Sequence, residues 1–399
     1  MSPHRGPPGK LPVTMSPRHR ALAAALAILI LGVIGARRPL HPPAELVLTG
    51  GRYLDVRAGV LRSNGAIEIR NGRIAAIHTP GSNWRPPAGV RAVALDQRVV
   101  IPGLIDAHVH LTLAGDPAAN ALATLRAGFT TVADLGSAGG AGIRLRDDIA
   151  AGRVAGPRVV AAGSWIGAKG GVCEFGGATV ATPDEAGRRA WADLDAGADL
   201  LKVCITGWPA EAVAFPDSVQ MGDLLLAPVL TAARARKRPV YAHAIGQTGA
   251  LLAAQAGVRA LAHTPVVDSS GAARLRAGGV RVISTLATLT SGDAGPDVLA
   301  SFRRLRRAGV PIVLGTDAGV LPHGENSREL LALTQAGLTP LEALRAATVD
   351  AAALLELRDA GEIVTGTRAD LMIVEGDPLA DVLVAGRPLT VIAAGRVVE

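Results

Sequence analysis

The sequence predicts an α/β protein, a (β/α)8 TIM barrel with a small β-sandwich domain built from both chain ends. Three observations predict this fold. The middle of the chain alternates eight short apolar strands with helix-like segments. This alternation occupies about 250 residues, the usual size of one such barrel. Both ends of the chain consist instead of short β-runs separated by tight turns.

Each predicted barrel strand is an apolar run, and glycine precedes several of them as expected for the end of a helix. A doubly wound open sheet is the alternative fold. The sequence lacks the glycine-rich nucleotide fingerprint that would favour it. The eight runs are VVIPGLIDAHVH, FTTVADLG, PRVVAAG, ADLLKVCI, PVYAHA, RALAHT, VRVISTLA and PIVLGTDA.

The β-rich ends set the domain boundaries. We expect residues 45–98 and 356–399 to form the two parts of the β-sandwich domain, and residues 99–355 to form the barrel. Asn64-Gly65 and Asn71-Gly72 separate short β-runs, and both dipeptides predict two-residue hairpin turns.

The pattern of residues 1–44 predicts a signal peptide or a membrane anchor, followed by a Pro-rich linker. Their apolar run, residues 21–36, has arginines on both sides and is shorter than the ~20 residues that span a bilayer untilted. We therefore expect an exported or membrane-anchored protein, in the cell envelope, the periplasm or outside the cell. In an oxidising compartment Cys173 and Cys204 could pair.

Composition argues against several classes of protein. The 399 residues are 49% hydrophobic and 19% charged, which is incompatible with a mainly disordered chain. The net charge of +7 suggests nucleic-acid binding, but residues 1–38 hold six of the 41 basic residues and no acid. The remainder is nearly neutral, so we expect no nucleic-acid partner.

Four histidines fall at the ends of predicted strands: His108, His110, His243 and His263. Catalytic groups of such barrels emerge at these ends. One histidine there is more often a hydrogen-bonded core residue, but an interior cannot easily satisfy four. Imidazole clusters of this kind suit Zn, Fe, Ni or Cu.

Lys202 and Asp317 also close predicted strands. The chain has four lysines and 37 arginines, and Lys202 directly follows Leu200 and Leu201. A buried lysine loses its proton readily, although a lysine that reaches solvent at the barrel mouth is the simpler interpretation. The Asp317 carboxylate can bind a metal or transfer a proton.

Taken in order, the motifs of residues 46–399 resemble those of the metal-dependent amidohydrolase superfamily, in the branch of imidazolonepropionase and the Xaa-Pro dipeptidases. The motifs are PGLIDAHVH, GFTTVADLG, ADLLKV, YAHAIG, ALAHT, LGTDAG, HGENSREL, LTPLEALRAATVDAA and GTRADLMIVEGDPL.

The resemblance implies a site of two divalent metal ions, with zinc as the expected metal. It implies hydrolysis of an amide-type C–N bond in a dipeptide, an N-acyl amino acid or a cyclic amide. A metal-bridging hydroxide would attack, with Asp317 as general acid and base. The implied ligands are His108, His110 and Asp317 for one ion, His243 and His263 for the other, and N6-carboxylated Lys202 between them.

Substrate contacts are expected from Tyr241, which shares a strand face with His243, and from His323 and Asn326 on the last barrel loop. A solvated loop is the alternative for the latter two. In this branch the fifth-strand motif is often HAHG and the sixth-strand motif is commonly EHG. Here Ile245 replaces the second histidine of HAHG and Ala262 replaces the glutamate of EHG, so the resemblance does not identify the substrate. Similar proteins are usually homo-oligomers, which we expect here.

Trp165, Phe175 and Trp208 also lie on or just after barrel strands, and they predict either an aromatic-lined pocket or ordinary packing. Three alternatives to the two-metal hydrolase remain at this point. One is a one-metal deaminase or imidazolonepropionase-like lactam hydrolase with unmodified Lys202. The others are a metal-free scaffold and a binding protein for small molecules.

Overall fold

The structure, a computed structural model, describes residues 46–399. The leader and linker predicted at 1–44 lie outside these residues. The described residues belong to one compact unit. Within residues 46–399, no helix has both the length and the apolar character needed to cross a membrane.

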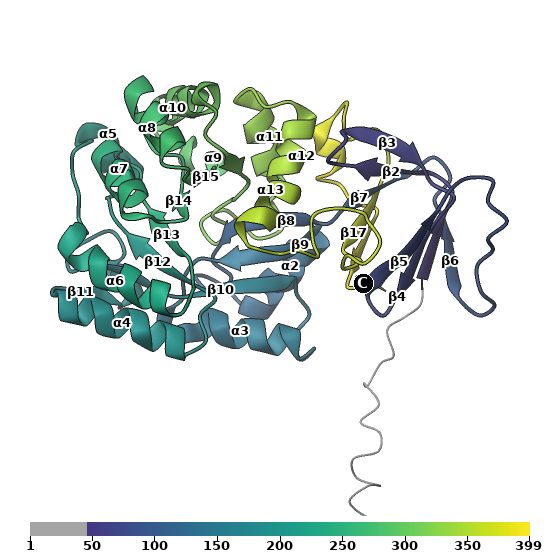
Figure 1. The fold of residues 1–399 in the computed structure, drawn as a ribbon, viewed down its shortest axis with the longest axis horizontal. Coiled ribbons are helices and arrows are strands. Elements are labelled where there is room, and N and C mark those ends of the chain that lie inside the picture. Colours follow the sequence, from purple (N-terminus) through teal and green to yellow (C-terminus); the bar gives the residue numbers. More distant parts are fainter. Residues whose placement is uncertain (1–45) are drawn as a thin grey trace, which may run out of the picture. The chain divides into compact units, whose positions relative to one another are not determined.

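Eight parallel strands form a nearly closed barrel, which confirms the predicted fold (Figure 1). The first and last strands meet through backbone bonds: Ala107 donates to the Leu314 carbonyl at 3.0 Å, and Asp317 donates to the His108 carbonyl at 2.7 Å. The strands are β8 (Leu104–Val109), β9 (Phe129–Asp134), β10 (Arg158–Ala168), β12 (Leu200–Cys204), β13 (Val240–His243), β14 (Ala260–Ala262), β15 (Arg281–Ile283) and β16 (Ile312–Val313), with β11 (Thr179–Val180) added beside β10.

Alternating residues of these strands fill the barrel interior. Many of them are alanines, such as Ala107, Ala133 and Ala260, and they pack in one buried cluster around the ring of Tyr241. Small side chains leave space for one large ring, because protein interiors pack without voids. The Tyr241 hydroxyl donates to the Leu354 carbonyl at 3.2 Å.

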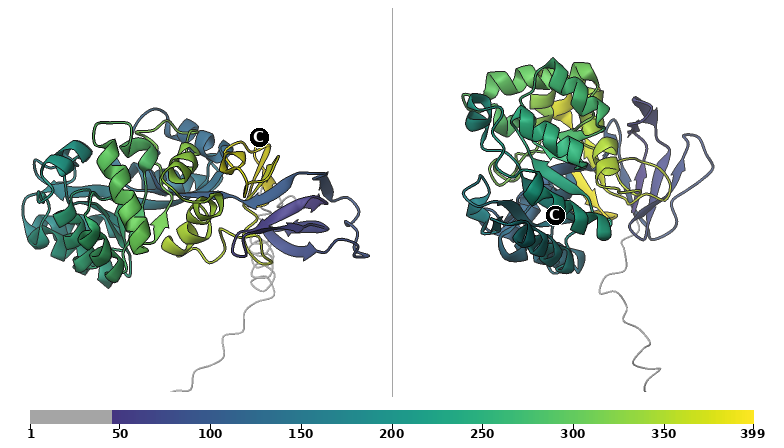
Figure 2. Two further views of the ribbon diagram at one scale, coloured as in Figure 1. Left: turned by 90° about the horizontal axis from the view of Figure 1, so that it is seen from above. Right: turned by 60° about the vertical axis from the view of Figure 1, so that its left-hand side comes forward.

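Helices connect the strands and surround the barrel (Figures 1 and 2). Left-handed Gly257 and Gly309 end α7 and α10, as the glycines before predicted strands indicate. The helices are α2 (Pro117–Arg126), α3 (Ala141–Ala150), α4 (Pro183–Asp195), α5 (Pro209–Ala214), α6 (Asp223–Ala235), α7 (Gln247–Ala256), α8 (Ser269–Ala277), α9 (Leu286–Leu289), α10 (Gly295–Ala308), α11 (Arg328–Gln335), α12 (Pro340–Ala346) and α13 (Val349–Leu354), with 3-10 turns η1 (Ala138–Gly140), η2 (Glu174–Gly176) and η3 (Val382–Val384).

Two small sheets from both chain ends form the β-sandwich-like domain. Their orders are β5-β4-β1-β6 and β19-β18-β17-β7-β2-β3, and they share an apolar core. The N-terminal strands are β1 (Leu46–Thr49), β2 (Arg52–Asp55), β3 (Val60–Ser63), β4 (Ala66–Arg70), β5 (Arg73–His78), β6 (Arg91–Ala94) and β7 (Val99–Pro102). The C-terminal strands are β17 (Leu371–Val374), β18 (Thr390–Ala393) and β19 (Arg396–Val397).

One of the two predicted hairpins forms. Asn71 and Gly72 connect β4 to its antiparallel partner β5 with positive φ angles of 50° and 72°. The prediction of a hairpin at Asn64-Gly65 is wrong, because β3 and β4 belong to different sheets. Asn64 is buried there, and its amide donates to the carbonyls of Leu48 and Gly50.

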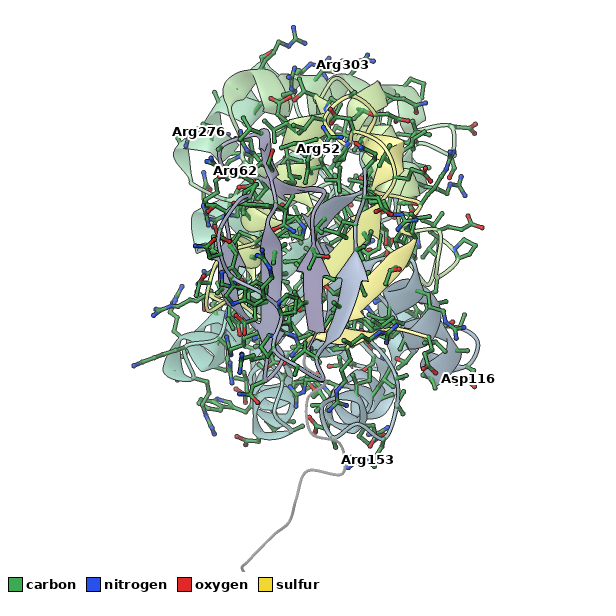
Figure 3. All side chains as sticks on the ribbon, turned by 90° about the vertical axis from the view of Figure 1, so that its right-hand side faces the viewer. Arg52, Arg62, Asp116, Arg153, Arg276 and Arg303 are labelled. Atoms are coloured by element: carbon green, nitrogen blue, oxygen red, sulfur yellow. A yellow bond between two sulfur atoms is a disulfide. The ribbon has the colours of Figure 1, made fainter. Side chains whose placement is uncertain are left out.

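The predicted run from Val99 to His110 is two strands. β7 joins both chain ends by pairing with β2 and β17, while β8 begins the barrel. Gly103 separates them where a Cβ atom would lie 2.2 Å from Thr130 Oγ1. Seen from the β-domain side, Arg153, Arg276 and Arg303 lie at the edge of the molecule (Figure 3), as expected for a charged surface.

Candidate metal centre

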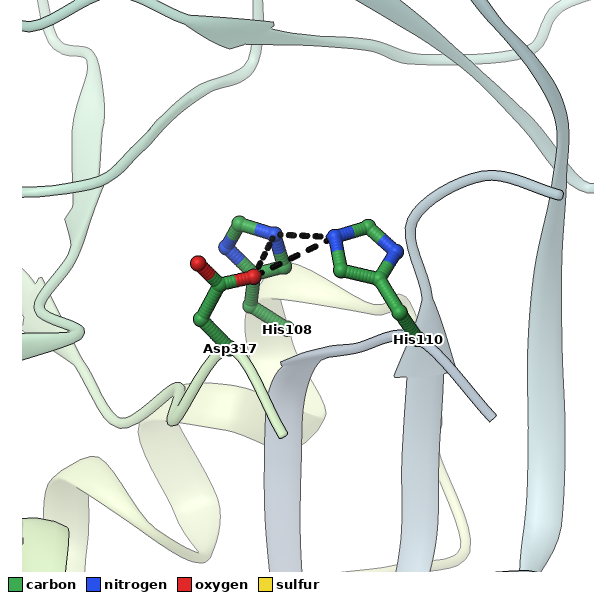
Figure 4. A group of neighbouring side chains, drawn as sticks. All are labelled: His108, His110 and Asp317. Atoms are coloured by element: carbon green, nitrogen blue, oxygen red, sulfur yellow. Dashed lines mark hydrogen bonds and ion pairs between the residues drawn. The ribbon is translucent and has the colours of Figure 1, made fainter. Parts of the chain in front are cut away.

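Three predicted ligands meet at the C-terminal mouth of the barrel (Figure 4). Asp317 Oδ1 lies 3.3 Å from His108 Nε2 and 3.2 Å from His110 Nε2, and the two Nε2 atoms are 3.2 Å apart. All three residues are buried. Two imidazole nitrogens and one carboxylate oxygen, aimed at one point, form a donor set for a divalent metal ion.

The backbone around the mouth is strained. His263, Thr285 and Asp317 have φ angles of 124°, 47° and 61°, and each follows the end of a barrel strand. Such angles are costly for residues with a side chain, and in proteins they concentrate at functional sites. Here they direct His263 and Asp317 towards the other histidines.

His243 and His263 lie beside this group. The His263 ring centroid is 4.7 Å from that of His108 and 4.6 Å from that of His243. Each histidine is oriented through one ring nitrogen: His243 Nε2 lies 3.1 Å from the Gly207 carbonyl, and His263 Nδ1 lies 3.0 Å from Thr285 Oγ1. The other nitrogen, Nδ1 of His243 and Nε2 of His263, remains as the donor for a metal.

Lys202 extends into the same space from β12. Its ammonium nitrogen is buried and has no hydrogen-bond partner among residues 46–399. Burial lowers the pKa of Lys202 to about 7, although the Asp317 carboxylate opposes this shift. A substantial fraction of Lys202 is therefore the neutral amine near neutral pH.

The electrostatics of the cluster favour metal binding. Burial lowers the pKa of His108 well below its ordinary value, and the charge of nearby Lys202 adds to this effect. The same two causes lower the pKa of His243 to about 4. Burial would raise the pKa of Asp317, but His108 and His110 outweigh it and hold this pKa well below its usual range. Neutral imidazoles and an ionised carboxylate are the protonation states that bind metals.

A buried carboxylate supports the centre, and our sequence analysis missed it. Asp106 accepts hydrogen bonds from the His108 and Thr316 backbones at 3.1 and 3.0 Å, and from Thr316 Oγ1 at 2.6 Å. Asn326 adds a fourth bond. The DAHVH motif contained the signal, because Asp106 lies two residues before His108 and accepts a hydrogen bond from the His108 backbone.

Glu329 is a second buried carboxylate that the sequence analysis missed. It accepts from Ser284 Oγ and from the backbones of Leu286 and Ala287. These bonds fix the residues on either side of Thr285, which orients His263. Glu329 therefore acts as a positioning residue for that histidine.

The three predicted substrate contacts occupy other places. Tyr241 fills the barrel interior, and Asn326 is fully buried beneath the mouth with its amide on Asp106. His323 is half-buried, with Nδ1 3.0 Å from Thr124 Oγ1 and Nε2 3.3 Å from the His110 carbonyl. Both nitrogens of His323 are engaged and the other two residues lie beneath the mouth, while a contact of any of the three with substrate stays a prediction.

Cys173 and Cys204 form a disulfide, the pairing that the sequence left open. Cys204 closes β12 two residues after Lys202, and Cys173 lies in the loop after β10. The disulfide therefore attaches that loop to the wall of the barrel mouth.

The amidohydrolase family model matches residues 99–398, which include the whole barrel and most of the C-terminal part of the β-domain. The chain belongs to the amidohydrolase family. This membership confirms the family resemblance. This amidohydrolase is therefore an enzyme, a hydrolase that acts on carbon–nitrogen bonds.

Several relatives and solved structures match most of the chain. Imidazolonepropionase of Salinispora arenicola is 28% identical over 79% of this chain and 86% of its own. A crystal structure of a Xaa-Pro dipeptidase with bound methionine has a TM-score of 0.79 at 26% identity, covering 89% of this chain and all of the other. A putative prolidase from Bifidobacterium longum has a TM-score of 0.80 at 29% identity, covering 90% of this chain and 95% of the other.

Proposed function

We propose that this amidohydrolase uses two divalent metal ions, with zinc as the expected metal, to hydrolyse an amide bond in a small substrate. The observation that carries the proposal is Lys202, a buried amine without a partner in the described part of the chain. It lies among histidines held neutral and the ionised Asp317. A buried amine without a hydrogen-bond partner is costly, so we infer that Lys202 has a chemical use.

Carboxylation supplies that use. The neutral Nζ of Lys202 attacks the carbon of CO2, an N–C bond forms, and one Nζ proton leaves to solvent. The product is a carbamate with one negative charge, which would lie between the two ions. His108, His110 and Asp317 would hold one ion, and His243 with His263 would hold the other.

Metal ions held by these residues would lower the pKa of a water molecule to near neutral and would polarise the scissile carbonyl. The protein supplies the proton transfer. Asp317 is ionised and lies at the centre of the cluster, so it accepts the proton of the attacking water. It then donates this proton to the leaving amine nitrogen, which completes the hydrolysis.

The deciding experiment is the metal content of the full chain, produced with added zinc and bicarbonate. About two ions per chain would support the proposal, and about one would favour a one-metal enzyme instead. A chain that binds no metal would contradict both functions.

The second candidate is a one-metal lactam hydrolase or deaminase with unmodified Lys202. One observation favours it: among residues 46–399, His108, His110 and Asp317 are the only group of three or more His, Cys, Asp or Glu residues whose ligand atoms all lie within 4.8 Å of one another. The imidazolonepropionase of S. arenicola is also among the relatives. A panel of dipeptides, N-acyl amino acids and lactams separates the two candidates by the class that is hydrolysed.

We further propose export of the protein, with residues 1–44 as signal peptide or membrane anchor. The Cys173–Cys204 disulfide supports this proposal, because disulfides persist mainly in oxidising compartments. Cell fractionation with N-terminal sequencing of the mature protein tests both export and cleavage. Light scattering of the same sample tests the expected homo-oligomer.

A further inference from the structure

Three aromatic residues, Trp165, Phe175 and Trp208, form one continuous surface at the barrel mouth, which we call the aromatic lip. The Trp165 and Phe175 ring centroids are 5.1 Å apart, and those of Phe175 and Trp208 are 6.4 Å apart and stacked. Trp165 is only 4% exposed, whereas Phe175 and Trp208 are 56% and 53% exposed. Contiguous exposed apolar surface is a feature of ligand-binding and protein-binding sites.

Both ends of the aromatic lip reach the metal centre. Trp165 contacts His110 with ring centroids 5.4 Å apart, and Trp208 meets His243 edge-on at 6.0 Å. The histidine rings between these two ends are also in contact: His110 with His108, His108 with His263, and His263 with His243. The aromatic lip is therefore the outward continuation of the catalytic centre.

Close packing and a disulfide hold the Trp165 ring and the Phe175 loop of the aromatic lip in place. Gly136 and Gly176 contact the Trp165 indole so closely that a Cβ atom on either would lie 2.5 Å from it. The Cys173–Cys204 disulfide attaches the loop that carries Phe175 to the end of β12. A preorganised aromatic surface loses little entropy when a ligand binds.

Acidic side chains lie next to the lip. Glu174 precedes Phe175 and is exposed. Glu211 is half-buried and accepts from the Gln220 amide at 3.2 Å, while Gln220 Oε1 accepts from the Val172 backbone at 2.8 Å. These carboxylates would repel an anionic group on a ligand.

We propose that the aromatic lip binds an uncharged aromatic group of the substrate and so directs this amidohydrolase towards neutral aromatic amides. The inference rests on the proposed function. Offset and edge-on stacking on Phe175 and Trp208 would orient such a group, and the scissile bond would lie inward at the metal centre. A second copy of the chain is the competing occupant, but contact of the lip with His110 and His243 favours the substrate.

Calorimetry on the metal-loaded full chain tests the proposal with three compounds of matched shape. We expect benzoylglycinamide to bind about 10-fold more tightly than acetylglycinamide, because only the benzoyl ring can stack. 4-Carboxybenzoylglycinamide carries a carboxylate on the ring that would lie on the lip beside Glu174 and Glu211, and it should bind more weakly than benzoylglycinamide. Equal binding of the benzoyl and acetyl compounds would overturn the proposal.

Variants assign the effect to the lip. Phe175→Ala and Trp208→Ala should each reduce the benzoyl preference by about 5-fold and leave acetylglycinamide binding unchanged. Trp191→Ala is the matched control, since Trp191 lies on outer helix α4, is 38% exposed and packs under Arg236. Should an alanine variant fail to fold, Phe175→Leu and Trp208→Leu keep an apolar side chain and remove the ring.

Three further outcomes are decisive. Loss of an oligomer in the lip variants, with the benzoyl preference intact, would show that the lip is an interface between copies and would overturn the inference. The release of glycinamide from both amides is measured separately. A benzoyl preference in binding without hydrolysis of any amide contradicts the proposed function alone, whereas hydrolysis without a preference contradicts the inference alone.

Discussion

Asn326 donates its side-chain amide to the Asp106 carboxylate at 2.8 Å, although 220 positions separate the two residues. The same carboxylate holds the His108 backbone and Thr316, which directly precedes Asp317. One buried carboxylate thus joins the first and last barrel strands at the point where both present metal ligands.

The first prediction concerns this bond. Asn326→Ala removes a donor from buried Asp106, which should lower the free energy of unfolding by about 1–3 kcal/mol. Because Asp106 positions His108 and Asp317, we also expect metal affinity to fall by about 10-fold or more. Urea unfolding of the chelator-treated protein and equilibrium dialysis against zinc measure the two effects.

Asn64→Ala is the matched control. Asn64 is also buried, and its amide donates to two carbonyls in the β-domain, far along the chain from the metal ligands. It should lose comparable stability and keep its metal affinity. Equal loss of metal in both variants would show that Asn326 has no specific positioning role.

Asn326 also shows what a sequence can and cannot predict here. The barrel and the positions of His108, His110 and Asp317 at strand ends follow from the spacing of apolar runs, because a parallel barrel collects the ends of its strands at one rim. Whether a loop residue faces substrate or a buried carboxylate depends on a partner far along the chain. No local pattern contains that information.

The sequence also does not show how deep in the barrel a strand residue lies. Tyr241 and His243 share a face, as alternation requires. Two residues of rise nevertheless place the tyrosine in the interior and the histidine at the mouth. The role of Glu329 was not predicted for another reason. In the sequence of a helix, a buried glutamate cannot be distinguished from an exposed one.

The second prediction concerns Lys202. Lys202→Ala should lower both bound metal and activity, because no carbamate can form. Acetate or propionate should restore part of both by supplying a carboxylate to the vacated space. Metal analysis and amide hydrolysis with and without these acids provide the measurement.

Lys169→Ala is the matched control. Lys169 lies at an exposed turn after β10, and this variant should behave as wild type. Full metal and full rate in Lys202→Ala would exclude the bridging role.

The third prediction concerns Asp317. Asp317→Asn should keep the fold, because asparagine tolerates the positive φ of 61° at this position. Turnover should fall by ~10²–10⁴ because the amide cannot carry the proton. The measurement is kcat at saturating zinc, with circular dichroism to verify folding. Unchanged kcat would remove Asp317 from the proton transfer.

The fourth prediction is a pH dependence of stability that arises from Glu329. Burial raises the pKa of Glu329 from 4.5 to about 8, against the hydrogen bonds from Ser284 and the backbone. The folded state therefore favours the protonated acid. Its contribution to stability is fully present below pH 4.5 and is lost as the pH rises through about 8.

Glu329→Gln removes the ionisation and keeps the size of the side chain. We therefore expect the free energy of unfolding of wild type, minus that of Glu329→Gln, to decrease from about pH 5 to about pH 8 and then to level off. Urea unfolding of both chelator-treated proteins across this range provides the difference, in which the other titrating groups cancel. Parallel curves would mean that Glu329 is ionised in the folded protein over the whole pH range. The backbone N–H groups of Leu286 and Ala287 would then stabilise the carboxylate, and no proton would lie between Glu329 and Ser284.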